Sequence, residues 1–397
     1  MAVDRDGIRI RYHSGAYVGM RYESAFIFDK ANLSGTAGIP PQSITTEAFF
    51  YSINLFEDSK ERKGFTMKGI AKKIIAVMLA LVTAVALCSV AVADEGKVYK
   101  IGILQFAEHG SLDNCRTGFI EGLAEAGFVE GENVEFVYQN AQADTSNTAM
   151  MASTLAETCD MICAIATPAA AAAYNAADGK IPVIYTAVSD PVAAQLANDD
   201  GTNPGAITGT SDALPVEAQL QLIRALQPEA TKIGILHTTS ETNSDSTLAT
   251  YKELAAQYGF EIVDKGISTG ADISLALDSL LPEVDCTTNL TDNTVVSYLS
   301  VVLEKSKEAG KPVYGSEIEQ VVNGCIASEG IEYVELGRQT GAMAARVLNG
   351  EDPATIPYEI ISNSYLYINP DALAEYGIEV PDDLMERAID VTADAAE

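Results

Sequence analysis

Histidine and basic side chains are scarce in this sequence. Its 397 residues include three His and 25 Lys or Arg against 56 Asp or Glu, for a formal net charge of −31. Eleven of the 25 basic residues fall within residues 1–93, so the remainder is more acidic still. A surface of that sign repels a phosphate backbone, which excludes binding to DNA or RNA. The acidity itself needs no function beyond solubility.

Ligands for a metal ion are also in short supply. Beyond residue 93 the only histidines are His109 and His237, and the cysteines form no C-x-x-C pair. An odd number of cysteines without that spacing is poor material for a zinc site or a disulfide framework. We therefore expect no metal and no cofactor, and we interpret the cysteines as small buried thiols. They are Cys115, Cys159, Cys163, Cys286 and Cys325.

Sequence signatures of catalysis are missing as well. The chain has no G-x-G-x-x-G and no Walker loop, and the candidate hydroxyls at the strand ends form no nucleophile elbow. Glu108 with His109, or His237, are candidates for an acid and a base, but no third orienting residue accompanies them. A lone histidine at a strand end is more often a hydrogen-bonded structural group. We therefore expect no catalytic residues and no enzymatic activity.

One segment has the layout of a secretory signal peptide. Met67 is followed by Lys68, Lys72 and Lys73, then by the uncharged apolar run Ile74–Leu87, and finally by an A-x-A cleavage site that ends at Ala93. The run has 14 residues, too few to cross a ~30 Å bilayer as a helix. A buried core helix fits less well because the run is apolar on every face. Residues 67–93 therefore predict export to the periplasm or the cell surface.

Residues 1–66 precede that segment, although a signal peptide belongs at the N-terminus. We interpret them as an upstream extension that is not translated, with synthesis starting at Met67. Lys63-Gly64 can be encoded as AAAGGA, a ribosome-binding sequence at a suitable distance. Cys88 would allow a lipid anchor, but Leu87 stands where a small residue is usual, so cleavage after Ala93 is favoured.

The exported part of the chain contains an internal duplication. Lys100–Leu104 recurs as Lys232–Leu236, an offset of 132 residues, and Pro182-Val183 recurs as Pro312-Val313 at an offset of 130. Both copies alternate short apolar runs with amphipathic segments. This alternation predicts an α/β fold, two doubly wound parallel-sheet lobes joined by hinge crossovers. In the first copy we expect strands at Val98–Phe106, Met161–Ala166 and Ile181–Val188. We expect its helices to be capped by Ser111 and by Thr167, which precedes Pro168. In the second copy we expect strands at Lys232–His237, Glu261–Val263 and Pro312–Gly315, and helices at Thr250–Tyr258 and Thr294–Glu308.

Ligands of doubly wound sheets bind beyond the carboxyl ends of the strands, so two facing lobes predict a site between them. The strand ends carry hydroxyls, amides and carboxylates, each of which is alone more often a cap or turn former. Together they define the candidate ligand-binding set: Phe106, Glu108, His109, Ser111, Thr167, Pro168, Ala169, Asp190, Ser211, Asp212, Ser240, Glu241, Asn243, Ser244, Thr291, Asp292, Asn293 and Glu317.

At these strand ends the sequence resembles the solute-binding proteins of ABC transporters that have a type I periplasmic-binding fold and include tryptophan and tyrosine binders. The matching stretches are Glu108–Asp113, Ile165–Ala170, Ala187–Val192, Gly209–Asp212, Ser240–Ser244, Thr291–Ser297 and Glu335–Met343. The resemblance spans about residues 98–384. It implies an extracytoplasmic, monomeric receptor that captures a small solute, an amino acid above all, for an ABC permease and its ATPase subunit.

The resemblance also implies how the chain is divided. The helix Tyr333–Leu348 has the pattern of one that returns to the first lobe in that family. The N-terminal lobe is then 97–210 plus 331–355, and the C-terminal lobe is 211–330 plus 356–390. One departure is the strand Cys286–Leu290, which is polar here and usually apolar in such proteins. It would either alter the choice of ligand or bond its hydroxyls to neighbouring backbone.

An aromatic amino acid would need both of its charges paired. Asp212 or Asp292 suits the α-ammonium, and hydroxyls and helix N-terminal amides at Thr167–Ala169, Ser211 or Ser240–Ser244 suit the carboxylate. Phe106 or a nearby tyrosine would face the ring. Two alternatives stay open: a doubly wound α/β enzyme, and a ligand-sensing module that acts on a small polar metabolite.

Overall fold

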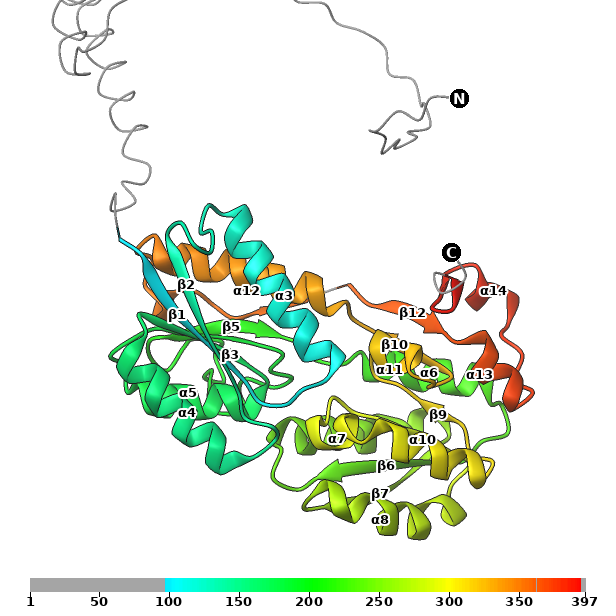
Figure 1. The fold of residues 1–397 in the computed structure, drawn as a ribbon. Coiled ribbons are helices and arrows are strands. Elements are labelled where there is room, and N and C mark those ends of the chain that lie inside the picture. The colour runs from blue at the N-terminus through cyan, green and yellow to red at the C-terminus, as the bar shows by residue number, and fades with distance from the viewer. Residues whose placement is uncertain (1–96, 362, 394–397) are drawn as a thin grey trace, which may run out of the picture. The chain divides into compact units, whose positions relative to one another are not determined.

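The computed structural model describes residues 97–361 and 363–393. The expected upstream extension, the signal peptide and Cys88 lie outside this range. The described chain forms two α/β lobes (Figure 1). The first contains β1 (Tyr99–Gln105), α3 (Gly110–Glu125), β2 (Val134–Asn140), α4 (Thr145–Thr158), β3 (Met161–Ile165), α5 (Thr167–Ala177), β4 (Val183–Thr186), β5 (Ile207–Ser211), α12 (Tyr333–Leu348), η4 (Pro353–Thr355) and β11 (Glu359–Ile360).

The second lobe begins with α6 (Val216–Leu226), β6 (Lys232–Thr238), α7 (Thr242–Leu254), η1 (Ala255–Tyr258), β7 (Glu261–Ile267), η2 (Gly270–Asp272), α8 (Ile273–Leu280) and η3 (Leu281–Glu283). It continues with β8 (Cys286–Thr288), α9 (Asn293–Ser297), α10 (Leu299–Glu308), β9 (Val313–Tyr314), α11 (Ile318–Val322) and β10 (Ala327–Gly330). The C-terminal elements are β12 (Tyr365–Ile368), α13 (Pro370–Glu375), α14 (Asp382–Met385) and β13 (Ala388–Asp390).

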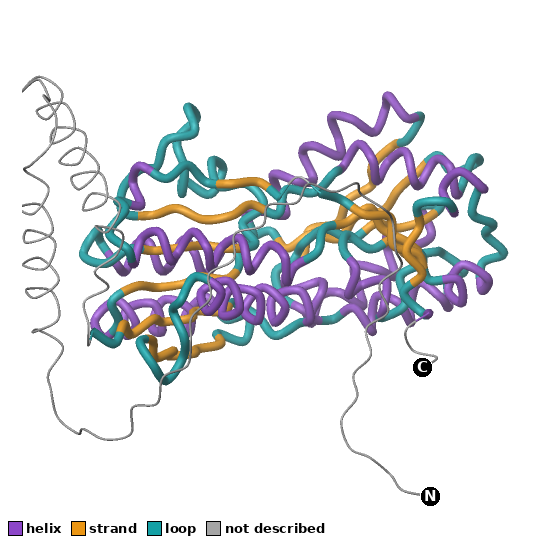
Figure 2. Tube along the Cα trace, turned by 90° about the horizontal axis from the view of Figure 1, so that it is seen from above, coloured by secondary structure: helices purple, strands orange, loops and turns teal. Residues whose placement is uncertain are grey.

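The six-stranded and four-stranded sheets are parallel and covered by helices on both faces, whereas the small third sheet is mixed, because β10 pairs antiparallel with β12. The first has the strand order β11-β5-β4-β3-β1-β2, with α4 and α5 on one face and α3 and α12 on the other. The second has the order β7-β6-β8-β9, and a three-stranded sheet, β10-β12-β13, adjoins it through backbone bonds from Gly315 to Ala327 and from Ile326 to Val313. In the view from above, strands lie beside helices in both lobes (Figure 2). The predicted pair of doubly wound lobes is confirmed.

The duplicated sequence occupies the same place in both lobes. β1 lies between β2 and β3, and β6 lies between β7 and β8 in the equivalent order. The repeated glycine marks where a helix presses on the sheet. A Cβ on Gly102 would lie 3.0 Å from Leu155 of α4, and one on Gly234 would lie 3.2 Å from Leu280 of α8. The repeat therefore conserves a close contact between strand and helix, not only a hydrophobic pattern.

The chain crosses between the lobes after β5, after β10 and after β11. The helix Tyr333–Leu348 returns to the first lobe as expected, where it packs on α3 and on the first sheet. The last crossing differs from the expected boundary at 355, because Glu359 and Ile360 still pair with Thr210 and Ser211 of β5. The first lobe thus extends to about residue 360, and the second resumes at β12.

Glycines let α3 and α12 approach at backbone distance. A Cβ on Gly118 would lie 2.0 Å from the carbonyl oxygen of Val334, and a Cβ on Gly337 would lie 2.3 Å from that of Cys115. Gly122 and Gly341 repeat the arrangement one turn further along each helix. This contact fixes α12, and with it the hinge at Tyr333, on the first lobe.

Helix starts depart from the expected caps. Ser111 is not the cap of α3, which begins at Gly110 with His109 as its N-cap and with no side-chain capping bond. Ala166, not Thr167, precedes α5. The expected helix Thr294–Glu308 breaks at Tyr298 into α9 and α10. The side chain of Ser111 instead lines a cavity with Glu317 of the other lobe, so it faces a tertiary neighbour and caps no helix.

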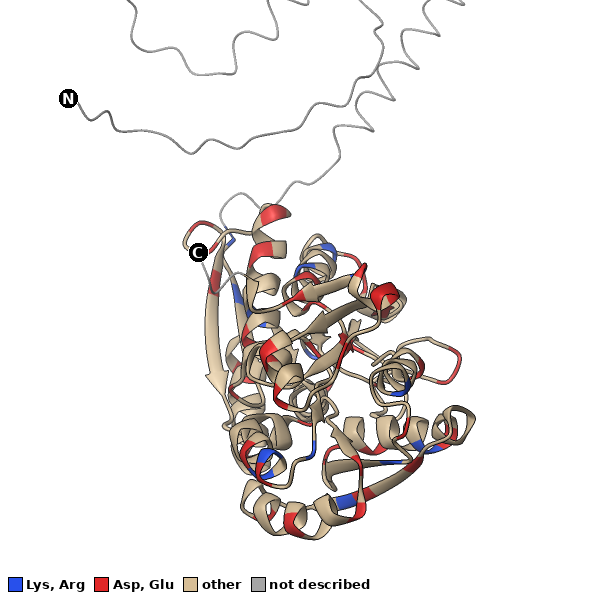
Figure 3. Cartoon of the chain, turned by 90° about the vertical axis from the view of Figure 1, so that its right-hand side faces the viewer, with Lys and Arg blue, Asp and Glu red and all other residues tan. Residues whose placement is uncertain are grey.

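The five cysteines of the exported part are buried and unpaired, as the sequence predicts. Burial raises the pKa of thiols such as Cys163, which keeps them uncharged. Among residues 97–361 and 363–393, no helix is long and apolar enough to cross a membrane. Acidic residues occur along many of the helices, strands and loops, with fewer basic ones among them (Figure 3).

Candidate functional site

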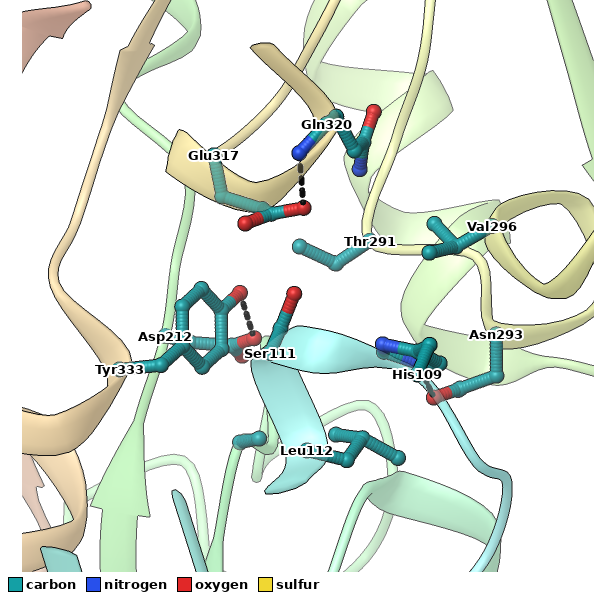
Figure 4. Close-up of a pocket in the computed structure, with 11 residues that line it drawn as sticks. His109, Ser111, Leu112, Asp212, Thr291, Asn293, Val296, Glu317, Gln320 and Tyr333 are labelled. Carbon is teal, nitrogen blue, oxygen red and sulfur yellow. Dashed lines mark hydrogen bonds between the residues drawn. The ribbon is translucent and has the colours of Figure 1, made fainter. Parts of the chain in front are cut away.

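A narrow cavity of about 10 Å³ lies between the two lobes (Figure 4). Its walls come from segments that follow the carboxyl ends of β1, β4, β5, β8, β9 and β10, the position expected for ligands of doubly wound sheets. This volume holds about one water molecule and is far below the roughly 300–1,000 Å³ of ligand pockets, so the closed lobes leave little space at this point. The lining residues are His109, Ser111, Leu112, Ala187, Asp212, Thr291, Asn293, Val296, Glu317, Gln320 and Tyr333.

Asp212 is the carboxylate that the first lobe contributes. It follows β5 and is only 2% exposed. Ser189 donates a 2.9 Å hydrogen bond to its Oδ1, and the hydroxyl of Tyr333 donates one of 2.9 Å to its Oδ2. Burial raises the pKa of Asp212, and the two hydrogen bonds lower it but do not cancel the rise. Asp212 is thus a carboxylate held in place by two neutral donors and lacking a cationic partner.

Glu317 is the carboxylate from the second lobe. It caps α11, accepting hydrogen bonds from the backbone nitrogens of Glu319 at 2.6 Å and Gln320 at 3.0 Å. The Ser111 hydroxyl on the other lobe also lines the cavity and lowers the pKa of this carboxyl. Burial nonetheless raises the pKa of Glu317 to about 7. Near neutral pH this carboxyl is therefore poised between its two protonation states.

His109 is the N-cap residue of α3. Its Nε2 lies 3.3 Å from Oδ1 of Asn293 in the other lobe, and its Nδ1 is buried without a partner. Burial lowers the pKa of His109 to about 4, so the ring is neutral at physiological pH. The histidine therefore supplies the cavity with a polar group and no charge.

Asp292 and Glu241, both expected to bind ligand, are occupied by the protein itself. Asp292 is fully buried and accepts bonds from the nitrogen and hydroxyl of Thr238, from Ser244 and from the nitrogen of Val295, at 2.5–2.9 Å. Glu241 accepts from the nitrogens of Asn293 and Thr294, both at 3.0 Å. These carboxylates anchor α9 to β6 and α7, and neither lines the cavity.

Six of the expected site residues line the cavity together: His109, Ser111, Asp212, Thr291, Asn293 and Glu317. The other expected residues lie elsewhere. Phe106 and Ala169 belong to the core of the first lobe, and Glu108 and Ser240 are exposed. Four of them make hydrogen bonds within the protein: Asp190 accepts one from the backbone nitrogen of Ala193, Ser211 donates to the carbonyl oxygen of Ser189, Asn243 donates to that of Thr291, and Ser244 donates to Asp292. Thr167 and Pro168 are the first two residues of α5.

Leu112, Ala187, Val296, Gln320 and Tyr333 line the cavity without having been expected there. Tyr333 had a usable signal, since it is the first residue of the helix predicted to cross lobes. Ala187 has a φ of 55°, a left-handed conformation that costs a non-glycine residue about 1–3 kcal/mol. The polar strand Cys286–Leu290 acts indirectly, because Asn289 donates a 3.0 Å bond to Oε1 of Gln320 and so orients it.

Three hydrogen bonds join the lobes around the cavity. Ser189 lies 3.0 Å from Thr291, Asn114 donates to Glu319 at 2.7 Å, and His109 meets Asn293 as described. Bonds of this length require the two lobes to be in contact. The structure therefore represents a closed arrangement of the described part of the chain.

The charges in the cavity are of one sign. Asp212 and Glu317 are buried in it, and none of its lining residues in the described chain is Lys or Arg. Within residues 97–361 and 363–393, no group of three or more His, Cys, Asp or Glu is arranged to hold a metal ion. A cationic group on a ligand would thus be the natural partner for these carboxylates.

Comparisons with known proteins agree with this architecture. A tyrosine-binding protein from Clostridioides difficile (strain R20291) is 39% identical over 281 residues, covering 70% of this chain and 81% of the relative. An ABC domain from Streptococcus pneumonia, solved in complex with L-Trp, is 33% identical with a TM-score of 0.71, covering 74% of this chain and 100% of that one. These relatives group the chain with solute-binding proteins.

A third relative bears on the state of the lobes. A substrate binding protein with adhesive properties from Clostridium difficile, solved ligand-free and open, is 39% identical but has a TM-score of 0.57, covering 74% of this chain and 99% of that one. This relative is closer in sequence than the domain solved with L-Trp, yet its structure superposes less well. A closed arrangement of the lobes in this chain and an open one in the relative would produce that difference. Residues 100–392 match the family model for ABC transporter substrate binding proteins, and the chain belongs to that family.

Proposed function

We propose that this protein captures an α-amino acid, preferably an aromatic one, in the cavity between its lobes. The observation that carries this proposal is the pair of buried carboxylates, Asp212 and Glu317, with no basic side chain among the lining residues of the described chain. Closing the lobes on two such groups without a counter-charge is unfavourable, because burial disfavours the ionised forms. A ligand that brings an ammonium group removes this penalty and favours closure.

The α-carboxylate of the ligand requires donors, and the cavity lining contains hydroxyls as well as carboxylates. Ser111 and Thr291 present hydroxyls to the cavity, and α3 begins beside them. α3 has 16 residues and no side-chain capping bond, so its first amides are free to meet an anion at the positive end of the helix dipole. The lining thus offers partners for both charges of a zwitterion.

The expected affinity also calls for both charges to be paired. Burying an aromatic ring of roughly 150–250 Å² contributes about 4–6 kcal/mol at ~25 cal/mol per Å². Micromolar capture needs about 8 kcal/mol after the costs of association. Contacts to the ammonium group and the carboxylate would supply the difference. The relatives named for tyrosine and solved with L-Trp support an aromatic solute.

The wider role follows from the family and from the segment before the lobes. We infer that residues 67–93 direct export and that the protein works outside the cytoplasm as a monomer. There it would present its solute to an ABC permease driven by an ATPase subunit. N-terminal sequencing of the precursor and of the exported protein tests this part. A peptide from residues 1–66 would contradict the start at Met67, and an N-terminus at Cys88 would indicate lipidation.

A thermal-shift screen against amino acids, nucleosides and sugars tests the proposed ligand class. A ligand that binds only the folded state raises the melting temperature by mass action. We expect the aromatic amino acids to raise it most, with calorimetry giving micromolar or tighter dissociation constants. A response to sugars or nucleosides alone would contradict the proposal. Chemical turnover of a responding compound would favour an enzyme instead.

A further inference from the structure

His109 lies between the cavity described above and a second, wider one. The second cavity, of about 250 Å³, shares His109, Ser111, Val296, Glu317 and Gln320 with the first. Its remaining walls are mixed: Leu299 and Leu303 of α10 are apolar, whereas Ser297, Ser300, Glu319 and Asn323 are polar. An amino acid whose charged end lies at Asp212 and Glu317 has room for its side chain there, and His109 stands at the junction.

The protein fixes which nitrogen of His109 carries the proton. Nδ2 of Asn293 donates a 2.7 Å hydrogen bond to Oε2 of Glu241, and the backbone nitrogen of Asn293 donates to the same oxygen at 3.0 Å. A carboxylate only accepts hydrogen bonds, so the side-chain nitrogen of Asn293 is assigned to the Glu241 side and its oxygen to the His109 side. Because Nε2 of His109 faces that oxygen at 3.3 Å, Nε2 is the protonated nitrogen.

Nδ1 of His109 is consequently a bare acceptor. The ring is neutral because burial lowers its pKa to about 4, so Nδ1 has a lone pair and no proton. It is buried and has no hydrogen-bond partner. Buried acceptors are rarely left unpaired in folded proteins, and each exception calls for an explanation. A carboxylate cannot satisfy this one, whereas an O–H or N–H group can.

We propose that Nδ1 of His109 accepts a hydrogen bond from the ring of the bound amino acid, so that the site selects aromatic side chains that carry a donor. The phenol of tyrosine and the indole of tryptophan have one, and phenylalanine has none. The inference rests on the proposed function and adds the basis of specificity to it. The two solutes named for the relatives, tyrosine and L-Trp, both carry a ring donor.

Calorimetry with a matched series of ligands tests this selection in the unmodified protein. Tyrosine or tryptophan should bind roughly tenfold or more tightly than phenylalanine, because the apolar ring leaves Nδ1 unpaired. 4-Fluorophenylalanine, which fills nearly the same space as tyrosine without a donor, should behave like phenylalanine. Equal affinity for all four would overturn the proposal while leaving the proposed function intact. Binding of none of them would overturn both.

The variant His109→Phe separates a ring contact from a contact to the ammonium group. It should remove the preference for tyrosine and tryptophan over phenylalanine, and the ratio of affinities is the readout because the variant also loses the bond to Asn293 between the lobes. Thr117→Ala, at an exposed position on the same helix, is the control and should preserve the discrimination. A ratio in His109→Phe equal to that of the parent, with or without a uniform loss of affinity, would show that another residue selects the ring and would overturn the proposal.

Nitrogen-15 NMR of the imidazole gives a readout that does not depend on binding or on the variant. The proposal expects a protonated Nε2 and an unprotonated Nδ1 from about pH 5 upward. It also expects the Nδ1 resonance to move on addition of tyrosine and not of phenylalanine. A protonated Nδ1 in the unliganded protein would overturn it.

Discussion

The hydroxyl of Tyr333 donates a 2.9 Å hydrogen bond to Oδ2 of Asp212. Asp212 follows β5, where the chain first leaves the first lobe, and Tyr333 opens α12, where the chain returns to it. The bond therefore links two of the three crossings at the wall of the cavity. A ligand that binds Asp212 acts directly on the segments about which the lobes close.

Asp212→Asn should abolish capture while leaving the fold intact. The substitution keeps the shape of the side chain but removes the charge that faces the ammonium group, so affinity should fall by roughly 100-fold or more. Tyr333→Phe removes one bond to that charge and should cost about tenfold. The melting temperature of Asp212→Asn should stay level or rise, since burial disfavours the ionised carboxyl. Calorimetry that finds unchanged affinity in Asp212→Asn would remove this residue from the site.

Asp292→Ala should instead destabilise the fold. Asp292 satisfies four donors, including the buried backbone nitrogens of Thr238 and Val295. Leaving buried donors unpaired costs about 1–3 kcal/mol each, so we expect a loss of about 3 kcal/mol or more in the free energy of unfolding. Denaturant titration measures it. A variant as stable as the parent but unable to bind would return Asp292 to the binding site.

The raised pKa of Glu317 predicts that affinity and stability change with pH in opposite directions. Its ionised form is needed to pair with an ammonium group, so affinity should rise between pH 5 and pH 8, by at most tenfold per unit below about pH 7. A calorimetric series in buffers of matched ionic strength measures this. Glu317→Gln should bind more weakly at pH 8 and show a flatter profile; a profile as steep as the parent's would exclude Glu317.

Stability of the unliganded protein should decline over the same range. Between the ordinary pKa of a glutamate and about 7, the folded state keeps the proton of Glu317 while the unfolded state has lost it. The free energy of unfolding therefore falls as pH rises from about 4.5 to about 7, by up to about 3 kcal/mol for this group, and is level above. Glu241, whose pKa burial also raises to about 7, adds to the trend.

Gly337→Ala tests the contact that seats the hinge helix. The new Cβ would lie 2.3 Å from the carbonyl oxygen of Cys115, so α12 and α3 would have to separate along their length. We expect a loss of about 3 kcal/mol, at the upper end for overpacking. Thr117→Ala, exposed beside the same contact, should change the free energy of unfolding by less than about 0.5 kcal/mol. Equal stability of the two variants would contradict the close packing.

The repeated pattern at Lys100–Leu104 and Lys232–Leu236 was enough to predict two lobes and the edge where ligands bind, because periodicity and repetition are local properties of a sequence. The difference between Asp212 and Asp292 was not predictable. Both come after a strand and directly after a hydroxyl residue, Ser211 or Thr291. Only the tertiary structure brings Thr238 and Ser244 to Asp292 while leaving Asp212 at the cavity. Tyr333 was missed for the same reason, since its partner is 121 residues away.

Calorimetry that compares tyrosine with its deamino analogue, 3-(4-hydroxyphenyl)propanoate, addresses the central claim most directly. The two share the ring, its donor and the carboxylate, and differ only in the ammonium group. If Asp212 and Glu317 bind that group, tyrosine should bind at micromolar concentration or below and the analogue at least 100-fold more weakly. An analogue that binds as tightly as tyrosine would contradict the account.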